Sequence, residues 1–200
     1  MRTDINVYAE IIDERVIEDC EINGACDSGL SWLRAMPRTL EQLRDYKLDW
    51  FRWLAQYTTV PALLEKLSAD SDNDMRKGVA QNAHTPVKVL EKLSADSYYG
   101  VRWGVAQNAH TPAKVLEKLS ADSDNDVRRE VAQNAHTPVK VLEKLSADSD
   151  NVVRKCVAQN AHTPVKVLEK LSDDSDNNVR WEAKKNKANR RDCLGKTREA

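Results

Sequence analysis

The sequence predicts an all-α protein built as a solenoid of tandem helical repeats. Its 200 residues hold only four histidines, each 26 residues from the next: His84, His110, His136 and His162. Residues 111–136 and 137–162 are identical at 22 of 26 positions. Each copy carries two short apolar stripes with helical spacing, separated by a polar turn. Such a repeat cannot bury its apolar faces alone, so we expect the copies to stack and share a core.

Five copies can be aligned, and they start at Thr59, Thr85, Thr111, Thr137 and Thr163. The two end copies are irregular. In the first, Pro61 lies one position later than the proline of the other copies. In the last, the pattern decays after Arg180, and Ala188 stands where a histidine would fall. Terminal repeats are typically irregular because they present a soluble outer face.

Each copy begins with signals for a first helix. Thr85 can cap this helix, and Pro86 suits its first position because the N–H that proline lacks would have no partner there. Val89, Leu90 and Leu93 then form one apolar stripe. The lysines and the glutamate around them are expected to face water.

A second, shorter helix follows the acidic turn. In the third copy, Ser123 and Asp126 have the S-x-x-D spacing of a helix start. Val127, Val131 and Ala132 form its apolar stripe. At about ten residues per helix, neither helix would be stable alone in water. Stability is therefore expected to come from packing between copies.

Residues 1–58 differ from the repeats in composition. They hold seven of the eleven aromatic residues, and seven basic against eleven acidic residues. Residues 49–54 are predicted to form a short aromatic-rich helix. We predict a helical N-terminal cap domain over residues 1–58, the repeat solenoid over 59–188 and a basic C-terminal tail over 189–200.

The repeat closely resembles the pattern of leucine-rich repeat variant (LRV) proteins. The resemblance rests on the run L-E-K-L-S-A-D-x-x-x-x-V-R-x-x-V-A-Q-N-x-x-T-P, in five in-register copies over residues 59–188. It implies a short α-helix and a second, often 3₁₀-like helix per repeat, stacked into a right-handed superhelix. HEAT-like repeats are the neighbouring alternative, but their helix pairs need longer units. The run DWFRWL at residues 49–54 is similar to segments of small bacterial and phage proteins.

The resemblance also raises an iron–sulfur cluster, because an LRV protein can carry a cysteine-ligated cluster in its N-terminal domain. Such a cluster normally takes four thiolates. Residues 1–58 offer only Cys20 and Cys26, while Cys156 stands at a variable repeat position and Cys193 near the C-terminus. We therefore expect no cluster held by this chain alone, and no other cofactor.

Composition and charge exclude several classes of protein. Lysine plus arginine (31) nearly balance aspartate plus glutamate (32), which excludes a polybasic nucleic-acid binder and a strongly acidic disordered chain. No run approaches the roughly 18 apolar residues of a membrane span. The N-terminus lacks the basic and apolar parts of a secretory signal, and the four cysteines are too scattered for a disulfide framework. These features predict a cytoplasmic protein that does not bind membranes.

No motif in the sequence indicates an enzyme. The chain has no G-x-S-x-G, P-loop or H-E-x-x-H motif, and its candidate catalytic residue types recur in several copies, as scaffold residues do. Equivalent histidines of stacked helices lie about 8–10 Å apart, too far to share one metal ion. The acidic turns lack the glycine and glutamate of a calcium loop. We expect no catalytic residue, metal site or small-molecule substrate; an active site within residues 1–58 stays open.

Each copy also contains an aspartate followed by an arginine six residues later. The pairs are Asp70/Arg76, Asp96/Arg102, Asp122/Arg128, Asp148/Arg154 and Asp174/Arg180. Two interpretations stay open. The pairs form salt bridges between the end of the first helix and the start of the second, or the arginines form a row for an anionic partner.

Differences between the copies mark a candidate binding surface. The first helices hardly vary, whereas the second helices do, and every aromatic residue of the repeats falls at one of the variable positions. Exposed tyrosine and tryptophan side chains are typical binding anchors. The candidate residues are Tyr98, Tyr99, Trp103, Trp181, Lys77, Arg129 and Lys155. Drift after recent duplication is the other explanation of this variation.

The predicted function is a non-catalytic binding or scaffold module that recognises a protein or peptide partner through this variable face. Near-neutral charge and aromatic anchors favour that partner. Nucleic acid is the alternative, because the row of Lys, Trp and Arg side chains and the basic C-terminal tail suit bases and phosphates. Residues 59–183 carry 17 basic and 19 acidic residues, so phosphate contacts would have to be local.

Overall fold

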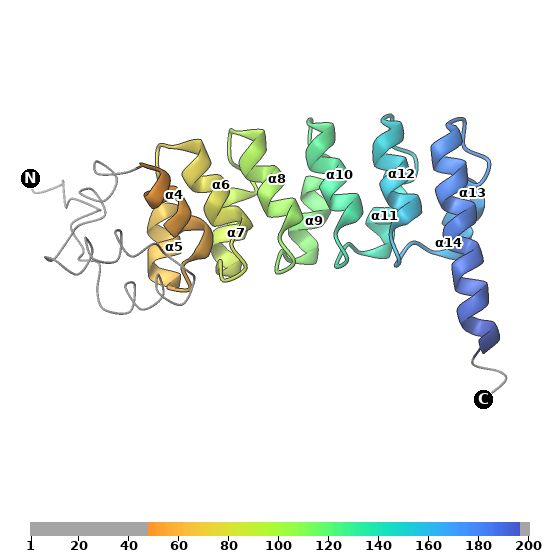
Figure 1. Ribbon diagram of the computed structural model, residues 1–200. Helices are drawn as coiled ribbons and strands as arrows, with labels where there is room; N and C mark the ends of the chain where they lie inside the picture. The colour runs from red at the N-terminus through yellow and green to blue at the C-terminus, as the bar shows by residue number, and fades with distance from the viewer. Residues whose placement is uncertain (1–47, 197–200) are drawn as a thin grey trace, which may run out of the picture. The chain divides into compact units, whose positions relative to one another are not determined.

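The computed structural model describes residues 48–196, which form eleven α-helices and no strand (Figure 1). These residues fall into two compact units, 48–110 and 111–196. The predicted all-α class and two-helix repeat are confirmed, because first and second helices alternate with the period of the sequence. Residues 1–47, which make up most of the predicted N-terminal cap, and residues 197–200 lie outside the described range.

The first unit contains two copies of the repeat and the helix that precedes them. Its helices are α4 (Leu48–Tyr57), α5 (Pro61–Leu67), α6 (Asn73–Gln81), α7 (Val87–Leu93) and α8 (Tyr99–Gln107). Helices α4, α6 and α8 pack side by side, and α5 and α7 lie against this row. The aromatic-rich helix predicted at residues 49–54 is therefore α4, and it packs against α6 as the second helix of a repeat would.

The second unit contains the remaining three copies. Its helices are α9 (Ala113–Leu119), α10 (Asn125–Gln133), α11 (Val139–Leu145), α12 (Asn151–Gln159), α13 (Val165–Leu171) and α14 (Asn177–Lys196). Helices α10, α12 and α14 form the packed row, with α9, α11 and α13 against it. Helix α14 is 20 residues long. It continues past Ala188, so position 189, where the C-terminal tail is predicted to begin, lies inside this helix.

The core of each unit consists of the apolar stripes predicted from the sequence. In the first unit, Val89, Leu90 and Leu93 of α7 are buried, together with Val101 and Val105 of α8. Burying one such side chain stabilises the fold by about 1.5–3 kcal/mol. The first helices have only seven residues each. Helices this short do not persist alone in water, so contacts with the second helices hold them.

Aspartates cap the second helices. Asp124 accepts hydrogen bonds from the backbone N–H groups of Asp126 (3.0 Å) and Val127 (3.3 Å), which would otherwise lack partners at the start of α10. The aspartates that do the same for α6, α12 and α14 are Asp72, Asp150 and Asp176. The prediction that the cap is Ser123 was therefore wrong by one residue.

The threonine of the Thr-Pro pair is not a helix cap either. Pro86 is the residue before the first helical turn of α7, and the hydroxyl of Thr85 donates to the backbone carbonyl of Val79 at 2.6 Å. Thr137 and Thr163 repeat this bond in the second unit. This buried threonine ties the end of one helix to the start of the next.

An asparagine at the same position of several copies bonds to the end of the preceding second helix within its unit. The side-chain amide of Asn108 donates to the carbonyls of Ala80 (2.8 Å) and Asn82 (2.9 Å), at the end of the preceding second helix. Its Oδ1 accepts the N–H of His110 (2.9 Å). Asn82, Asn160 and Asn186 donate to the preceding helix in the same way. We call this set the asparagine ladder; it satisfies carbonyls that a helix end leaves without partners.

Three of the repeated arginines, Arg76, Arg128 and Arg154, pair with the aspartate of the next copy. Arg76 Nε and Nη2 lie 2.7 and 3.0 Å from the two carboxylate oxygens of Asp96, and Nη1 donates to the backbone carbonyl of Asp70. Arg128 and Arg154 make the same contacts with Asp148 and Asp174. The prediction of a carboxylate pair within one copy was wrong for these arginines, because Asp96, Asp148 and Asp174 pair with the arginine of the copy before them. We call these pairs the arginine ladder.

Candidate functional site

Helix α8 starts differently from the other second helices of the described copies. Tyr98 stands at the cap position and makes no side-chain cap hydrogen bond. Its backbone is unchanged, since the N–H of Tyr98 donates to Asp96 Oδ1 at 2.9 Å, as the N–H of Asp124 does to Asp122. Replacing a capping aspartate costs about 0.5–2 kcal/mol. Compared with the other copies, tyrosine in place of aspartate at position 98 therefore removes a stabilising hydrogen bond without altering the backbone of the turn.

The rings of Tyr98 and Tyr99 pack edge to face, with centroids 5.1 Å apart. Tyr99 is 45% exposed. The ring of Tyr98 lies over Gly100, where an added Cβ would be only 2.6 Å from Cε1 of that ring. Real Cβ atoms do not approach other atoms so closely, so Gly100 allows the ring to take this position. The three residues that distinguish this copy at positions 98–100 therefore pack against one another.

Trp103 extends this aromatic surface along α8. It lies four residues after Tyr99 and so on the same helix face. It is half-buried, and Lys77 Nζ lies 5.2 Å from its ring centroid. A cation at that distance interacts favourably with the face of an indole ring. The structure thus places four of the predicted site residues on neighbouring α6 and α8: Lys77, Tyr98, Tyr99 and Trp103. We call them the α8 aromatic cluster.

The other three predicted site residues lie at one repeat position in the second unit. Arg129 of α10 is held by the carboxylates of Asp126 and Glu130, and Lys155 of α12 is half-buried. Trp181 of α14 is 59% exposed, with Lys185 Nζ 4.6 Å from its ring centroid. Of the three, Trp181 offers the most accessible surface.

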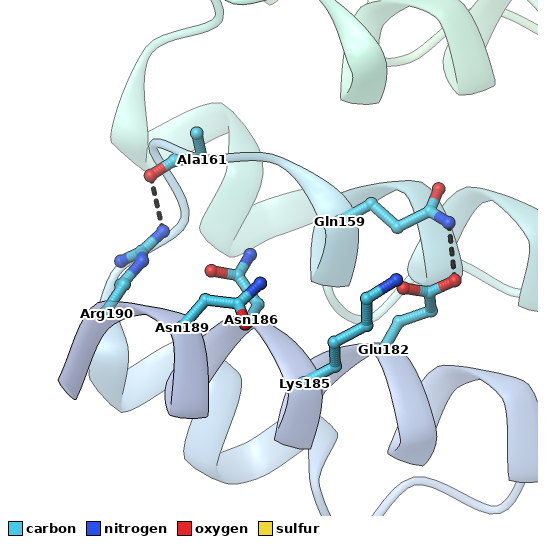
Figure 2. A pocket seen from close by; sticks show the side chains of 7 residues that line it. All are labelled: Gln159, Ala161, Glu182, Lys185, Asn186, Asn189 and Arg190. Atoms are coloured by element: carbon cyan, nitrogen blue, oxygen red, sulfur yellow. Dashed lines mark hydrogen bonds between the residues drawn. The ribbon is translucent and has the colours of Figure 1, made fainter. Parts of the chain in front are cut away.

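A groove of about 840 Å³ lies between α14 and the end of α12 (Figure 2). Its lining residues are Gln159, Ala161, Glu182, Lys185, Asn186, Asn189 and Arg190. Two hydrogen bonds cross it, one from Gln159 Nε2 to Glu182 Oε1 (2.7 Å) and one from Arg190 to the carbonyl of Ala161. A smaller cavity of about 240 Å³ lies one copy earlier and shares Gln159 and Ala161 with it.

This groove was not predicted from the sequence, because it forms where α14 continues beyond the point at which the other second helices end. After α12 the chain turns away at Asn160, whereas α14 runs on beside that turn. There Arg190 donates to the carbonyl of Thr163 at 2.7 Å. The replacement of a histidine by Ala188 and the basic residues around it were the signals that the repeat pattern had changed.

Within the described part of the chain, no group of three or more His, Cys, Asp or Glu side chains is placed to hold a metal ion. The four histidines are exposed at the turns. Cys156 is a buried free thiol. Burial raises its pKa, although Gln133 Nε2 donates a hydrogen bond to its sulfur at 3.1 Å. Cys20 and Cys26, the residues considered for a cluster, lie outside residues 48–196.

None of the helices between residues 48 and 196 combines the length and the apolar character that crossing a bilayer requires.

Comparison with known proteins finds similar structures but no matching sequence family. No family model and no curated protein matches the chain. One similar solved structure is a leucine-rich repeat variant with a novel repetitive structural motif, at 22% identity and a TM-score of 0.37, covering 86% of this chain and 80% of that one. Another is an engineered protein, at 22% identity and a TM-score of 0.45, covering 86% and 94%.

Proposed function

We propose that this repeat scaffold is a non-catalytic binding module that recognises a protein or peptide through the variable face of its second helices. The observation that carries the proposal is the start of α8. There a capping aspartate is replaced by Tyr98, and Gly100 leaves space for its ring. Giving up a stabilising bond to display aromatic side chains is expected where those side chains bind a partner.

The chemistry of the α8 aromatic cluster suits a protein surface or a peptide. Tyrosine and tryptophan combine a large apolar area with a polar group and are enriched at the energetic centres of interfaces. Tyr99 and Trp103 present aromatic surface on one face of α8, and the ammonium group of Lys77 lies next to the Trp103 ring. The free thiol of Cys156 agrees with a cytoplasmic, reducing location.

Two observations weigh against nucleic acid as the partner. Arg76, Arg128 and Arg154 are engaged by aspartates of the arginine ladder. Arg129, the one arginine in the variable row, is neutralised by two acidic neighbours. Binding nucleic acid depends on several cations that are free to contact phosphates.

The proposal can be tested by panning a phage-displayed library of random peptides against the immobilised protein. We expect enriched peptides to lose at least tenfold in affinity for the double variant Tyr99→Ala/Trp103→Ala, because about 1.4 kcal/mol or more of aromatic contact is removed. The far-UV circular dichroism spectrum should stay unchanged.

Tyr57→Ala is the matched control, since it removes another exposed aromatic side chain of the first unit, outside the repeat copies. Peptides that bind both variants as well as the parent would contradict the proposal. Salt-sensitive retention of single-stranded DNA with no peptide enrichment would favour the nucleic-acid alternative.

A further inference from the structure

The groove between α12 and α14 contains a cation without an anionic partner. The carboxylate of Glu182 accepts a hydrogen bond from Gln159, and Arg190 is occupied by backbone carbonyls of the turn after α12. Lys185 lies between Glu182 and Arg190 along α14, and its side chain extends toward Gln159 and Glu182 (Figure 2). Within the described residues its ammonium group contacts the ring of Trp181 and forms no ion pair.

The same groove contains a hydrogen-bond acceptor that has lost its usual donor. In the earlier copies the Oδ1 atom of the ladder asparagine accepts the N–H of the histidine two residues later, as in Asn160 and His162. In α14 the chain stays helical after Asn186, so the N–H of Ala188 belongs to the helix. Asn186 still donates to the carbonyls of Ala158 and Asn160. Its oxygen is left at the groove, where a ligand N–H can reach it.

Charge favours an anionic ligand in this region. Residues 177–190 of α14 include five basic side chains and one acidic side chain. One of the five, Lys187, lies 3.8 Å from Glu169, and another, Arg190, is bound to carbonyls. Lys185 is the basic side chain that both lines the groove and keeps its charge unpaired.

Dimensions and polarity indicate an extended peptide as the ligand. Packed helices lie about 8–10 Å apart, the span of about three extended residues. Amide groups of Gln159, Asn186 and Asn189 line the groove, and side-chain amides can pair with both the N–H and the C=O groups of a peptide. Nucleic acid would need a series of free cations, of which the groove has one.

We propose that this groove binds an extended peptide segment through one acidic side chain, with Lys185 as its ion-pair partner and the groove amides as contacts for the peptide backbone. The proposal rests on the proposed function, because it names a partner chemistry for the α14 part of the variable face. The smaller cavity one copy earlier is lined by uncharged groups such as Gln133 and Ala135. It suits a small neutral side chain about three residues from the acidic one.

The test uses the full chain labelled with ¹⁵N and a seven-residue peptide with a single central glutamate, blocked at both ends. We expect chemical-shift changes in the side-chain amides of Gln159 and Asn189 and in the indole of Trp181. The same peptide with glutamine or lysine at the centre should bind more weakly, by up to about fivefold, the loss of one exposed ion pair. A glutamine peptide with a free terminal carboxylate distinguishes a C-terminal anion from a side-chain anion.

Lys185→Gln and Lys184→Gln are a matched pair of variants on α14. Each removes one positive charge, but Lys185 lines the groove and Lys184 does not. We expect Lys185→Gln to abolish the preference for glutamate over glutamine, and Lys184→Gln to leave it within about twofold. Equal losses in the two variants would overturn the proposal, because general attraction to a basic helix would explain them.

Three further outcomes would also overturn it: no shift at millimolar peptide, shifts outside the groove, or tighter binding of a single-stranded oligonucleotide that Lys184→Gln and Lys185→Gln weaken alike. Failure here is distinguishable from failure of the proposed function. The panning experiment depends on Tyr99 and Trp103 of the first unit, whereas this titration depends on Lys185 of the second.

Discussion

Helices α8 and α12 are equivalent elements of the two units, and they differ most at their first residues. At the start of α12, Asp150 caps two backbone N–H groups and accepts a hydrogen bond from Asn125 of the previous copy. At the start of α8, Tyr98 and Tyr99 replace the residues that make such bonds. Both helices keep the same buried stripe and the same asparagine at their end. The repeat thus separates the positions that hold copies together from the positions that are free to change.

The largest expected difference between these two classes of position is in the stability of core and surface variants. Leu142→Ala should lower the free energy of unfolding by about 2–5 kcal/mol, because Leu142 is fully buried and its loss leaves a cavity. Tyr99→Ala, on the exposed face, should change it by less than about 0.5 kcal/mol. Urea unfolding followed by circular dichroism measures both. Similar losses in the two variants would mean that the variable face is part of the core.

The second prediction tests how much the asparagine ladder stabilises the fold. Asn160→Ala removes two donated hydrogen bonds to buried carbonyls and the acceptor for the N–H of His162. We expect a loss of about 2–3 kcal/mol in unfolding free energy, since buried polar groups lose their partners. Lys166→Ala, at an exposed position of α13, serves as control. A loss under 1 kcal/mol would mean that water replaces the amide.

The arginine ladder predicts a dependence of stability on pH. The hydrogen bond from Arg154 lowers the pKa of Asp174 below its ordinary value, and burial opposes this only in part. A lowered pKa in the folded state means that the ionised carboxylate stabilises the fold above the ordinary pKa, and that this stability is lost as the pH falls through the folded pKa. Asp174→Asn should therefore cost about 1–2 kcal/mol at pH 7.

The difference between parent and Asp174→Asn should begin to shrink below the ordinary aspartate pKa of about 4, and should disappear as the pH falls through the lowered pKa of the folded state. Denaturant midpoints of both proteins at neutral and acid pH measure this. A difference that stays constant with pH would show that the loss comes from packing and not from the charge.

The smallest effect should be a gain of stability. Tyr98→Asp restores the cap that α6, α10 and α12 have, and we expect it to raise the free energy of unfolding of the first unit by about 0.5–1 kcal/mol. Tyr98→Ala, which restores nothing, should not. If peptide binding weakens while stability rises, then residue 98 exchanges stability for recognition. A loss of stability in Tyr98→Asp would contradict the comparison between α8 and α12.

The sequence predicted the helices and their buried stripes well because these depend on local spacing. Val89, Leu90 and Leu93 recur in a pattern that only one helix face can bury. Contacts between copies were harder to predict: Arg76 has an aspartate six residues earlier in its own copy, yet it pairs with Asp96. Because the copies are nearly identical, each arginine has an equivalent aspartate in its own copy and in the next one. Only the packing of the copies decides which of the two aspartates it contacts.

The candidate site was predicted only in part, because comparison of the copies identifies variable residues but not their neighbours in space. Variation between copies located Tyr98, Tyr99 and Trp103 without knowledge of their neighbours, and the structure places them together with Lys77. The role of Gly100 depends on the orientation of one ring, and the groove depends on α14 continuing as a helix. Neither follows from spacing, because both arise where the chain departs from the repeat.

The hydrogen bonds of the asparagine ladder all run in the same direction along the chain. Within each unit every donor of the ladder lies in the later copy and every accepting carbonyl in the earlier one. As the chain leaves the ribosome, each copy is therefore completed by the one that follows it. A chain that gains or loses one whole copy within a unit would keep each donor of the ladder opposite an equivalent carbonyl.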